Sequence, residues 1–315
     1  MNKDQESLGD RMDRRGFLEC AAWAGTGLLW TVSGGILSSR AFGQEGTGKG
    51  GARAEFTFVQ ISDTHFGFSK EPNKDPAATV QEAIRKVNAL PSAPAFVLHT
   101  GDITHLAKPA EFDAAAQVLK GLRADVHYVP GEHDVLSDET KPYLERYGKG
   151  TKGLGWKSFD HGGIHFVGLV NVVNLRPSGL GYLGAEQLEW LKKDLEPHSD
   201  STPVVVYTHM PLWTIHEKWG WGTDDSEQAL TLLRRFGSVT VLNGHIHQIM
   251  QKVEGNITFH TARSLAFPQP KPGEASNPGP MKNVPADKLR EMLGITSVGV
   301  VSNPGTLAVI DSTLA

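Results

Sequence analysis

The chain has 315 residues, with 31 lysines and arginines against 35 aspartates and glutamates, and a formal net charge of -4. This near-neutral balance excludes the basic surface that binding to a nucleic-acid backbone or to an anionic membrane requires. The 13 histidines accompany a single cysteine, which excludes an internal disulfide and a cysteine-rich zinc site. The histidines are therefore the residues whose placement needs an explanation.

Residues 1–43 have the composition of a targeting segment. The run Arg14-Arg15-Gly16-Phe17-Leu18 precedes an apolar stretch from Ala21 to Leu37, and small residues follow at Ala41 and Gly43. This order resembles the twin-arginine export signal. The resemblance implies removal of residues 1–43, an interaction with the twin-arginine export machinery, and a periplasmic or other extracytoplasmic location reached in folded form.

Two positions depart from that signal. Asp13 stands where Ser or Thr is usual, and Glu19 stands where Lys is frequent. An uncleaved membrane anchor is the alternative, but glycines, a serine and threonines interrupt the run within the length of about 18–20 residues that a span requires. Lipid attachment at Cys20 is a second alternative, but a lipoprotein cysteine follows its apolar run. We therefore expect no stable membrane span and no cysteine in the mature chain.

Beyond a Gly-rich lead-in at 44–53, one domain is predicted over residues 54–315. Strands are predicted at 56–61, 96–99, 126–129, 164–170, 204–207 and 239–242, and helices at 76–90, 109–122, 185–195 and 226–236. Later β-type segments are predicted at 249–253, 257–260, 297–301 and 307–310, with a long Pro/Gly-rich loop at 268–290. Alternating strands and helices predict an α/β layered fold with its site beyond the C-terminal ends of the strands.

Five polar clusters directly follow predicted strands. They are Asp63-Thr64-His65, Gly101-Asp102, Gly131-Glu132-His133-Asp134, His209, and Gly244-His245-Ile246-His247. One such cluster alone is typical of a hydrogen-bonded structural residue, but five in succession indicate a site. Carboxylate oxygens and imidazole nitrogens bind divalent metals. The number of such side chains in the five clusters exceeds what one four-coordinate ion needs. We expect two ions about 3.5–4 Å apart that share a bridging carboxylate.

The five motifs in this order resemble the calcineurin-like metallophosphoesterases over roughly residues 56–267, and within them the subgroup with bacterial cyclic-nucleotide phosphodiesterases. Residues 181–191 also resemble a helix entry common in that subgroup. The resemblance implies a four-layer α/β/β/α sandwich of two mixed β-sheets flanked by helices. It also implies a metal-dependent phosphoric ester hydrolase that acts on a small-molecule phosphodiester or phosphomonoester.

The same resemblance implies a role for each residue. Asp63, His65 and His247 would hold the first metal, Asp102 would bridge, and Glu132, His209 and His245 would hold the second. His133, oriented by Asp134, would act as the general acid that protonates the leaving alkoxide. A hydroxide bridging two ions of Fe, Mn or Zn would attack phosphorus in line, and the ions would offset the charge on the phosphoryl oxygens.

Glu132 departs from the family motif, which has Asn at this position. Asn is neutral and can donate a hydrogen bond to phosphate, whereas Glu adds a negative charge and only accepts. Three carboxylates around the metals would lower their Lewis acidity and repel phosphate, or would favour Fe(III). The alternative is a metal-binding protein without hydrolytic activity, or with an altered substrate, on the same scaffold. A one-metal hydrolase acting on a non-phosphate bond is a third hypothesis.

Several other residues have open roles. We expect His105 either to reach the substrate or the metal surroundings, or to be exposed or capping. The Trp213–Trp221 segment contains three tryptophans, which predict equally a stacking wall for substrate or a cluster packed under the loop. Arg263 is a candidate phosphate ligand. Structural roles are predicted for six further histidines: His99, His127, His161, His165, His198 and His260.

Overall fold

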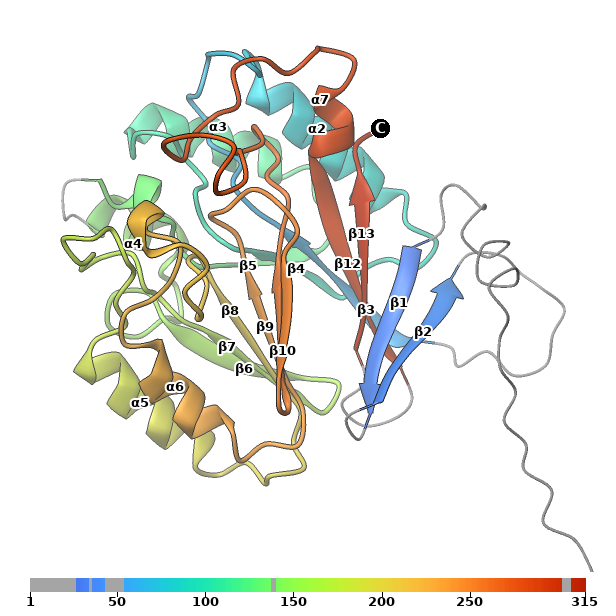
Figure 1. Cartoon of the computed structure of the whole chain (residues 1–315), viewed down its shortest axis with the longest axis vertical. Coiled ribbons are helices and arrows are strands. Elements are labelled where there is room, and N and C mark those ends of the chain that lie inside the picture. The colour runs from blue at the N-terminus through green and yellow to red at the C-terminus, as the bar shows by residue number, and fades with distance from the viewer. Residues whose placement is uncertain (1–26, 34–35, 43–53, 137–139, 302–306) are drawn as a thin grey trace, which may run out of the picture.

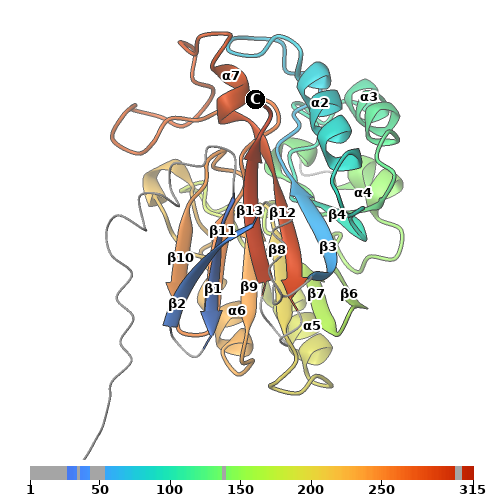
Figure 2. The same ribbon diagram turned by 90° about the vertical axis from the view of Figure 1, so that its right-hand side faces the viewer.

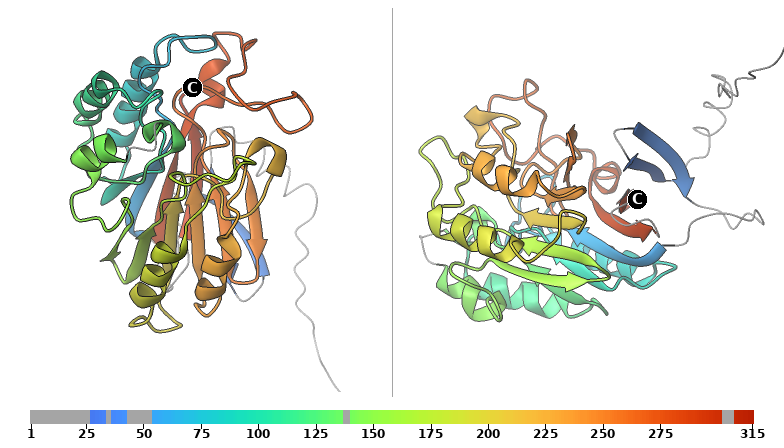
Figure 3. Two further views of the ribbon diagram at one scale, coloured as in Figure 1. Left: turned by 90° about the vertical axis from the view of Figure 1, so that its left-hand side faces the viewer. Right: turned by 90° about the horizontal axis from the view of Figure 1, so that it is seen from below.

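The computed structural model describes residues 27–33, 36–42, 54–136, 140–301 and 307–315. Two β-sheets lie face to face, and helices cover both outer faces (Figure 1 and, seen from below, Figure 3). This arrangement confirms the predicted four-layer α/β/β/α sandwich.

The first sheet has five strands in the order β13-β12-β3-β4-β5. Its strands are β3 (Ala54–Ile61), β4 (Phe96–His99), β5 (Asp125–Tyr128), β12 (Gly294–Val301) and β13 (Leu307–Thr313). Strands β3, β4 and β5 are parallel, whereas β12 pairs antiparallel with both β3 and β13. The helices on this side are α2 (Pro76–Asn88), α3 (Pro109–Leu119) and α4 (Lys141–Tyr147).

The second sheet has six strands in the order β10-β11-β9-β8-β7-β6. Its strands are β6 (Lys157–His161), β7 (Ile164–Gly168), β8 (Val204–Thr208), β9 (Val239–Asn243), β10 (Gln251–Glu254) and β11 (Ile257–Thr261). The four inner strands are parallel, and β6 and β10 are antiparallel edges. Helices α5 (Ala185–Leu195) and α6 (Ser226–Leu233) pack on its outer face.

The core follows from the alternation of side chains along buried strands. In β8, Val204 and Val206 contact the α5–α6 layer, and Val205 and Tyr207 contact the other sheet. Because both faces of a central strand are covered, every residue of β8 is buried, which explains its continuous apolar run.

The predicted strands and helices are present with small shifts at their ends, and several short elements are additional. The edge strand β6, helix α4 and the short helix α7 (Leu289–Met292) were not expected. Strand β6 was missed because its sequence is mostly polar, as is common at a solvated sheet edge. No helix or strand interrupts residues 268–288, within the predicted loop.

The run Arg14–Leu18 and the lead-in at 44–53 lie outside the described residues. Part of the apolar stretch forms an antiparallel hairpin of β1 (Gly27–Ser33) and β2 (Ile36–Phe42) in the full-length chain. The hairpin lies beside β13 (Figure 2). Cleavage and export stay predictions.

Within the described part of the chain, none of the helices has the length and apolar character needed to cross a bilayer.

An ion-pair cluster ties β6, β7 and α5 together at the end of the second sheet that is remote from the polar clusters. His165 contacts Asp160 at 2.8 Å through Nδ1 and Asp194 at 3.0 Å through Nε2. Burial lowers the pKa of His165, but the hydrogen bonds to Asp194 and Asp160 outweigh burial, so the pKa is raised. The imidazolium form therefore joins the three elements, in agreement with the structural role predicted for His165.

We expect the contribution of His165 to stability to depend on pH. Because its folded-state pKa is raised, the ion pairs are fully formed below the ordinary pKa of histidine and are lost as the pH rises through the folded value. His165→Gln should lower the free energy of unfolding by about 1–2 kcal/mol at pH 6, and by less at pH 9. Urea denaturation of both proteins at both pH values measures the difference.

His127→Gln is the matched control for that series. Burial lowers the pKa of His127 to about 4, so this ring stays neutral from pH 6 to pH 9. Because the unfolded chain binds a proton at this position near pH 6 and the folded chain does not, the loss of stability in His127→Gln should be smaller at pH 6 than at pH 9, opposite to the trend for His165→Gln. A loss for His165→Gln that is equal at both pH values would contradict the ion-pair interpretation.

Candidate metal centre

All five polar clusters lie where the parallel strands end. Asp63 and His65 follow β3, Asp102 follows β4, Glu132, His133 and Asp134 form the short 3-10 helix η1 after β5, His209 follows β8, and His245 and His247 follow β9. The two sheets bring these ends together, because the layers pack face to face with the strand ends at a common edge.

One group of ligands comprises Asp63, His65, Asp102 and His247. All four are buried, and one ligand atom from each lies within 4.8 Å of the others. Nε2 of His247 is 3.1 Å from Oδ1 of Asp63 and 3.3 Å from Nε2 of His65. Nδ1 of His247 donates to the carbonyl of Phe267 at 2.5 Å, which leaves Nε2 as the nitrogen that faces the group. This donor set fits a divalent cation.

A second group comprises Glu132, His209 and His245. The two oxygens of Glu132 lie 2.8 Å from Nε2 of His209 and 3.1 Å from Nδ1 of His245. Nδ1 of His209 donates to the carbonyl of Thr100 at 2.7 Å, so Nε2 again faces the group.

Unsatisfied polar atoms are concentrated in this second group. Among the described residues, Oε2 of Glu132, Nε2 of His209 and both ring nitrogens of His245 are buried and make no hydrogen bond of good geometry, although the Glu132 oxygens lie close to both rings. A buried polar atom without a partner is costly, and a bound cation would satisfy these atoms. The residues therefore fit a second metal ion.

Asp102 lies between the two groups. Its Oδ2 is 3.4 Å from Nε2 of His65 in the first group and 3.5 Å from Nε2 of His209 in the second. Its Oδ1 accepts a hydrogen bond from the backbone N–H of His133 at 3.0 Å. This is the position that a carboxylate shared by two ions requires.

The electrostatics of the cluster favour added positive charge. Burial and the charge of Glu132 raise the pKa of Asp102 well above its ordinary value. Burial also raises the pKa of Glu132, but attraction to His245 and His209 outweighs it and holds the pKa well below the ordinary value. Burial lowers the pKa of His209, but Asp102 and Glu132 outweigh it, so the pKa is raised well above normal. Protons and imidazolium rings thus neutralise the carboxylates, and metal cations in the same place would do so in their stead.

Backbone strain marks the same residues. Of the six non-glycine residues with positive φ in the described chain, five are Asp63, His65, Asp102, His245 and His247. Such conformations are costly and persist where the surroundings enforce them, commonly at functional sites. Close packing contributes: a Cβ at Gly244 would lie 2.5 Å from Oδ2 of Asp63, so only glycine permits this approach.

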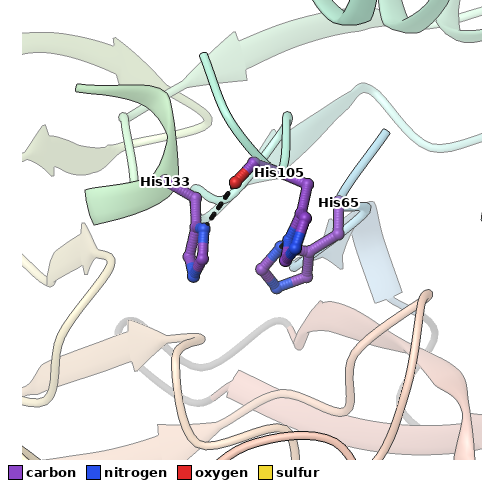
Figure 4. Close-up of side chains that lie close together, drawn as sticks. All are labelled: His65, His105 and His133. Atoms are coloured by element: carbon purple, nitrogen blue, oxygen red, sulfur yellow. Dashed lines mark hydrogen bonds between the residues drawn. The ribbon is translucent and has the colours of Figure 1, made fainter. Parts of the chain in front are cut away.

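His133 lies beside the first group, stacked on His105 and facing His65 (Figure 4). Its Nδ1 donates to the carbonyl of His105 at 2.7 Å, so Nε2 is the nitrogen left for exchange with a substrate. The His105 ring stacks on the His133 ring with centroids 4.9 Å apart. His105 therefore positions the proposed acid.

The prediction that Asp134 orients His133 is wrong. The carboxylate of Asp134 turns into the loop and accepts hydrogen bonds from the backbone N–H groups of Gly131, Ile103 and Thr104 at 2.8–3.0 Å. It is fully buried, because η1 directs successive side chains to different sides of the turn. Asp134 thus fixes the loop after β4 against the loop after β5.

Sequence reasoning missed the acceptors that orient the histidines. These are the backbone carbonyls of Thr100, His105 and Phe267. A carbonyl is present in every residue, so no residue type signals such an acceptor. Arg263, the predicted phosphate ligand, lies against Gly294 at the start of β12.

The tryptophans of the Trp213–Trp221 segment pack within the protein. Trp221 is fully buried, and Trp213 contacts the ring of Phe259 at 5.0 Å between centroids. Trp219 contacts the edge of Trp221 at 5.0 Å. Of the two predictions, packing under the loop fits this arrangement.

Comparison with known proteins agrees with the fold. The family model for calcineurin-like phosphoesterases matches residues 56–249. A 3',5'-cyclic-nucleotide phosphodiesterase of Nostoc sp. is 24% identical over 67% of this chain and 79% of its own length. A glycerophosphodiester phosphodiesterase of Enterobacter lignolyticus is 24% identical over 70% of this chain and 81% of its own.

The architecture is also found in a solved structure. A dimetal phosphatase from Danio rerio superposes with a TM-score of 0.65 at 14% identity, covering 84% of this chain and 98% of the other. At this identity the likeness concerns the fold alone. The match to the family model spans more than half of the chain, and the chain therefore belongs to the calcineurin-like phosphoesterase family of hydrolases.

Proposed function

We propose that the chain is an exported phosphoesterase that uses two metal ions to hydrolyse a small-molecule phosphodiester or phosphomonoester. The observation that carries the proposal is the place of Asp102 between two groups of ligand atoms. The names of the bacterial relatives, which are phosphodiesterases for cyclic nucleotides and for glycerophosphodiesters, support a diester substrate.

Each proposed ligand has a defined role. Asp63, His65 and His247 would hold one ion, Glu132, His209 and His245 the other, and Asp102 both. When bound, two ions of Fe, Mn or Zn would activate water for in-line attack on phosphorus and offset the charge on the phosphoryl oxygens.

His133 supplies the proton in this proposal. Its Nδ1 is fixed by the carbonyl of His105, and its backbone N–H is fixed by Asp102. The free Nε2 therefore stays at a constant position relative to the ligand groups. As the bond from phosphorus to the leaving oxygen breaks, the proton on Nε2 passes to that oxygen.

Two substitutions separate metal binding from proton transfer. Wild-type protein without residues 1–43 should contain two metal ions per chain. Asp102→Asn should lower both the metal content and kcat/KM, the latter by about a hundredfold or more, because the shared ligand loses its charge. His133→Gln should keep the metals but lower kcat by about 10²–10⁴-fold for an ester with a phenol leaving group.

The choice of leaving group tests the role of His133. The loss of kcat in His133→Gln should be smaller for an ester of 4-nitrophenol than for an ester of phenol, because 4-nitrophenolate leaves without needing a proton. Elemental analysis and assays with Mn- or Fe-loaded protein provide the measurements. One ion per chain would favour the one-metal alternative. A protein that hydrolyses neither aryl phosphodiesters nor aryl phosphomonoesters would sink the proposal for those substrate classes.

Glu132 distinguishes this proposal from a non-hydrolytic protein on the same scaffold. Both of its oxygens face histidines of the second group. This two-point contact favours a ligand adapted to its site over one that merely disables it.

Glu132→Asn should therefore lower kcat/KM for an aryl phosphodiester by about tenfold or more. The shorter, neutral side chain carries one oxygen in place of two and withdraws it from His209 and His245. Steady-state kinetics measure the change, with Glu189→Asn on the exposed face of α5 as the matched control. A gain of activity in Glu132→Asn would support the non-hydrolytic alternative.

Export rests on the sequence of residues 1–43. Replacing Arg14 and Arg15 by Lys should keep the full-length protein in the cytoplasm, because the twin-arginine machinery reads the arginine pair. Cell fractionation with immunodetection compares this variant with the wild type, and Lys3→Arg is a control that leaves the pair intact. Equal periplasmic levels of the double variant and the wild type would contradict the twin-arginine route.

A further inference from the structure

A cleft of about 600 Å³ opens beside the second group of ligands. Its lining comprises Glu132, Val135, Leu136, the loop of residues 172–176 and Tyr182. A volume of this size suits a small organic molecule.

The lining of the cleft combines apolar and polar side chains. Valine, leucine and tyrosine side chains alternate in it with Glu132, Asn174 and Arg176. The described residues include four large hydrophobic side chains that are strongly exposed, and two of these, Leu136 and Leu175, lie in this cleft. Exposed apolar side chains that gather on one concave surface indicate a binding site, whereas singly scattered ones do not.

A planar platform lies in the same cleft. The guanidinium of Arg176 stacks over the ring of Tyr182, 3.7 Å from its centroid, and Nε of Arg176 contacts Asp224 at 2.7 Å. The salt bridge with Asp224 offsets the charge of Arg176, and the stack offers a flat surface to a ring.

The Trp213–Trp221 segment and the residues just after it hold this platform in place. Gly181 donates to the carbonyl of Gly222 at 3.0 Å, and the N–H of Asp224 donates to the carbonyl of Gly181 at 2.9 Å. The backbone after the buried Trp221 thus supports the wall that carries Tyr182.

We infer that this cleft binds a bulky, uncharged, ring-containing group of the substrate that stays on phosphorus during hydrolysis. The inference rests on the proposed function. Glu132 lines the cleft whereas His133 does not, so the cleft is separate from the side where the leaving oxygen takes its proton. Water adds its oxygen to phosphorus, the bond to the alcohol outside the cleft breaks, and that alcohol leaves with the proton from His133.

Charge and size exclude two other classes of substituent. The negative charge of Glu132 and the paired charge of Arg176 disfavour a second phosphate in the cleft. A three-carbon polyol would occupy a small part of the volume and would leave its hydroxyls against valine and leucine side chains. An aromatic or heterocyclic group satisfies both constraints.

The test compares two diesters with the same leaving group, phenyl 4-nitrophenyl phosphate and methyl 4-nitrophenyl phosphate. Metal-loaded wild type should have a kcat/KM at least about tenfold higher for the phenyl diester, because only the phenyl group is large enough to contact the exposed leucines and the Arg176–Tyr182 stack. Leu175→Asp should reduce this ratio to near one. Val253→Asp, which changes an equally exposed residue on β10 outside the cleft, should leave the ratio unchanged.

The outcomes separate this inference from the proposed function. Hydrolysis of both diesters at equal kcat/KM, or an unchanged ratio in Leu175→Asp, overturns the cleft inference and leaves the phosphoesterase intact. Hydrolysis of neither diester overturns both. Release of phenol from the phenyl diester in place of 4-nitrophenol would place the ring on the leaving side and would also contradict the inference.

Discussion

Two buried carboxylates and a third that is partly exposed lie close together where the two sheets meet, and the centre is organised around the repulsion between them. Asp63, Asp102 and Glu132 each face an imidazole nitrogen at 2.8–3.5 Å. Imidazoles offset part of the negative charge, but the buried atoms of the second group that lack a hydrogen bond of good geometry show that the compensation is incomplete. Metal cations complete it, so the architecture that assembles these side chains is also what makes them bind metal.

The scaffold holds these groups together through the ends of parallel strands and through the connections between the sheets. Gln60 of β3 donates to Thr100 of its own sheet at 3.0 Å and to the carbonyl of Asn243 of the other sheet at 3.1 Å. Backbone carbonyls then fix the tautomers of three histidines. Because the ring orientations are set by the main chain, the site tolerates little change of loop conformation, in keeping with its strained backbone.

Much of the fold was predictable because hydrophobic periodicity reports burial directly, as the continuous apolar run of β8 illustrates. The grouping of the polar clusters was also predictable, since consecutive strand ends converge in open α/β sheets. Side-chain direction was not. Asp134 follows His133 in sequence but points into the loop, and the carbonyl of His105, which no residue type announces, orients His133 in its place. The cleft depends on residues 172–176 and 182, which acquire a shared function only when the chain has folded.

His245 and His247 lie two residues apart in one short turn, yet each belongs to a different ligand group. The other ligands come from both sheets and from distant parts of the chain. Neither ion can therefore be held by one sheet alone, and assembly of the two sheets must precede or accompany metal loading. A chain that crosses a membrane already folded, as the proposed export route requires, would then carry ions selected by the compartment in which it was made, whatever metals prevail at its destination.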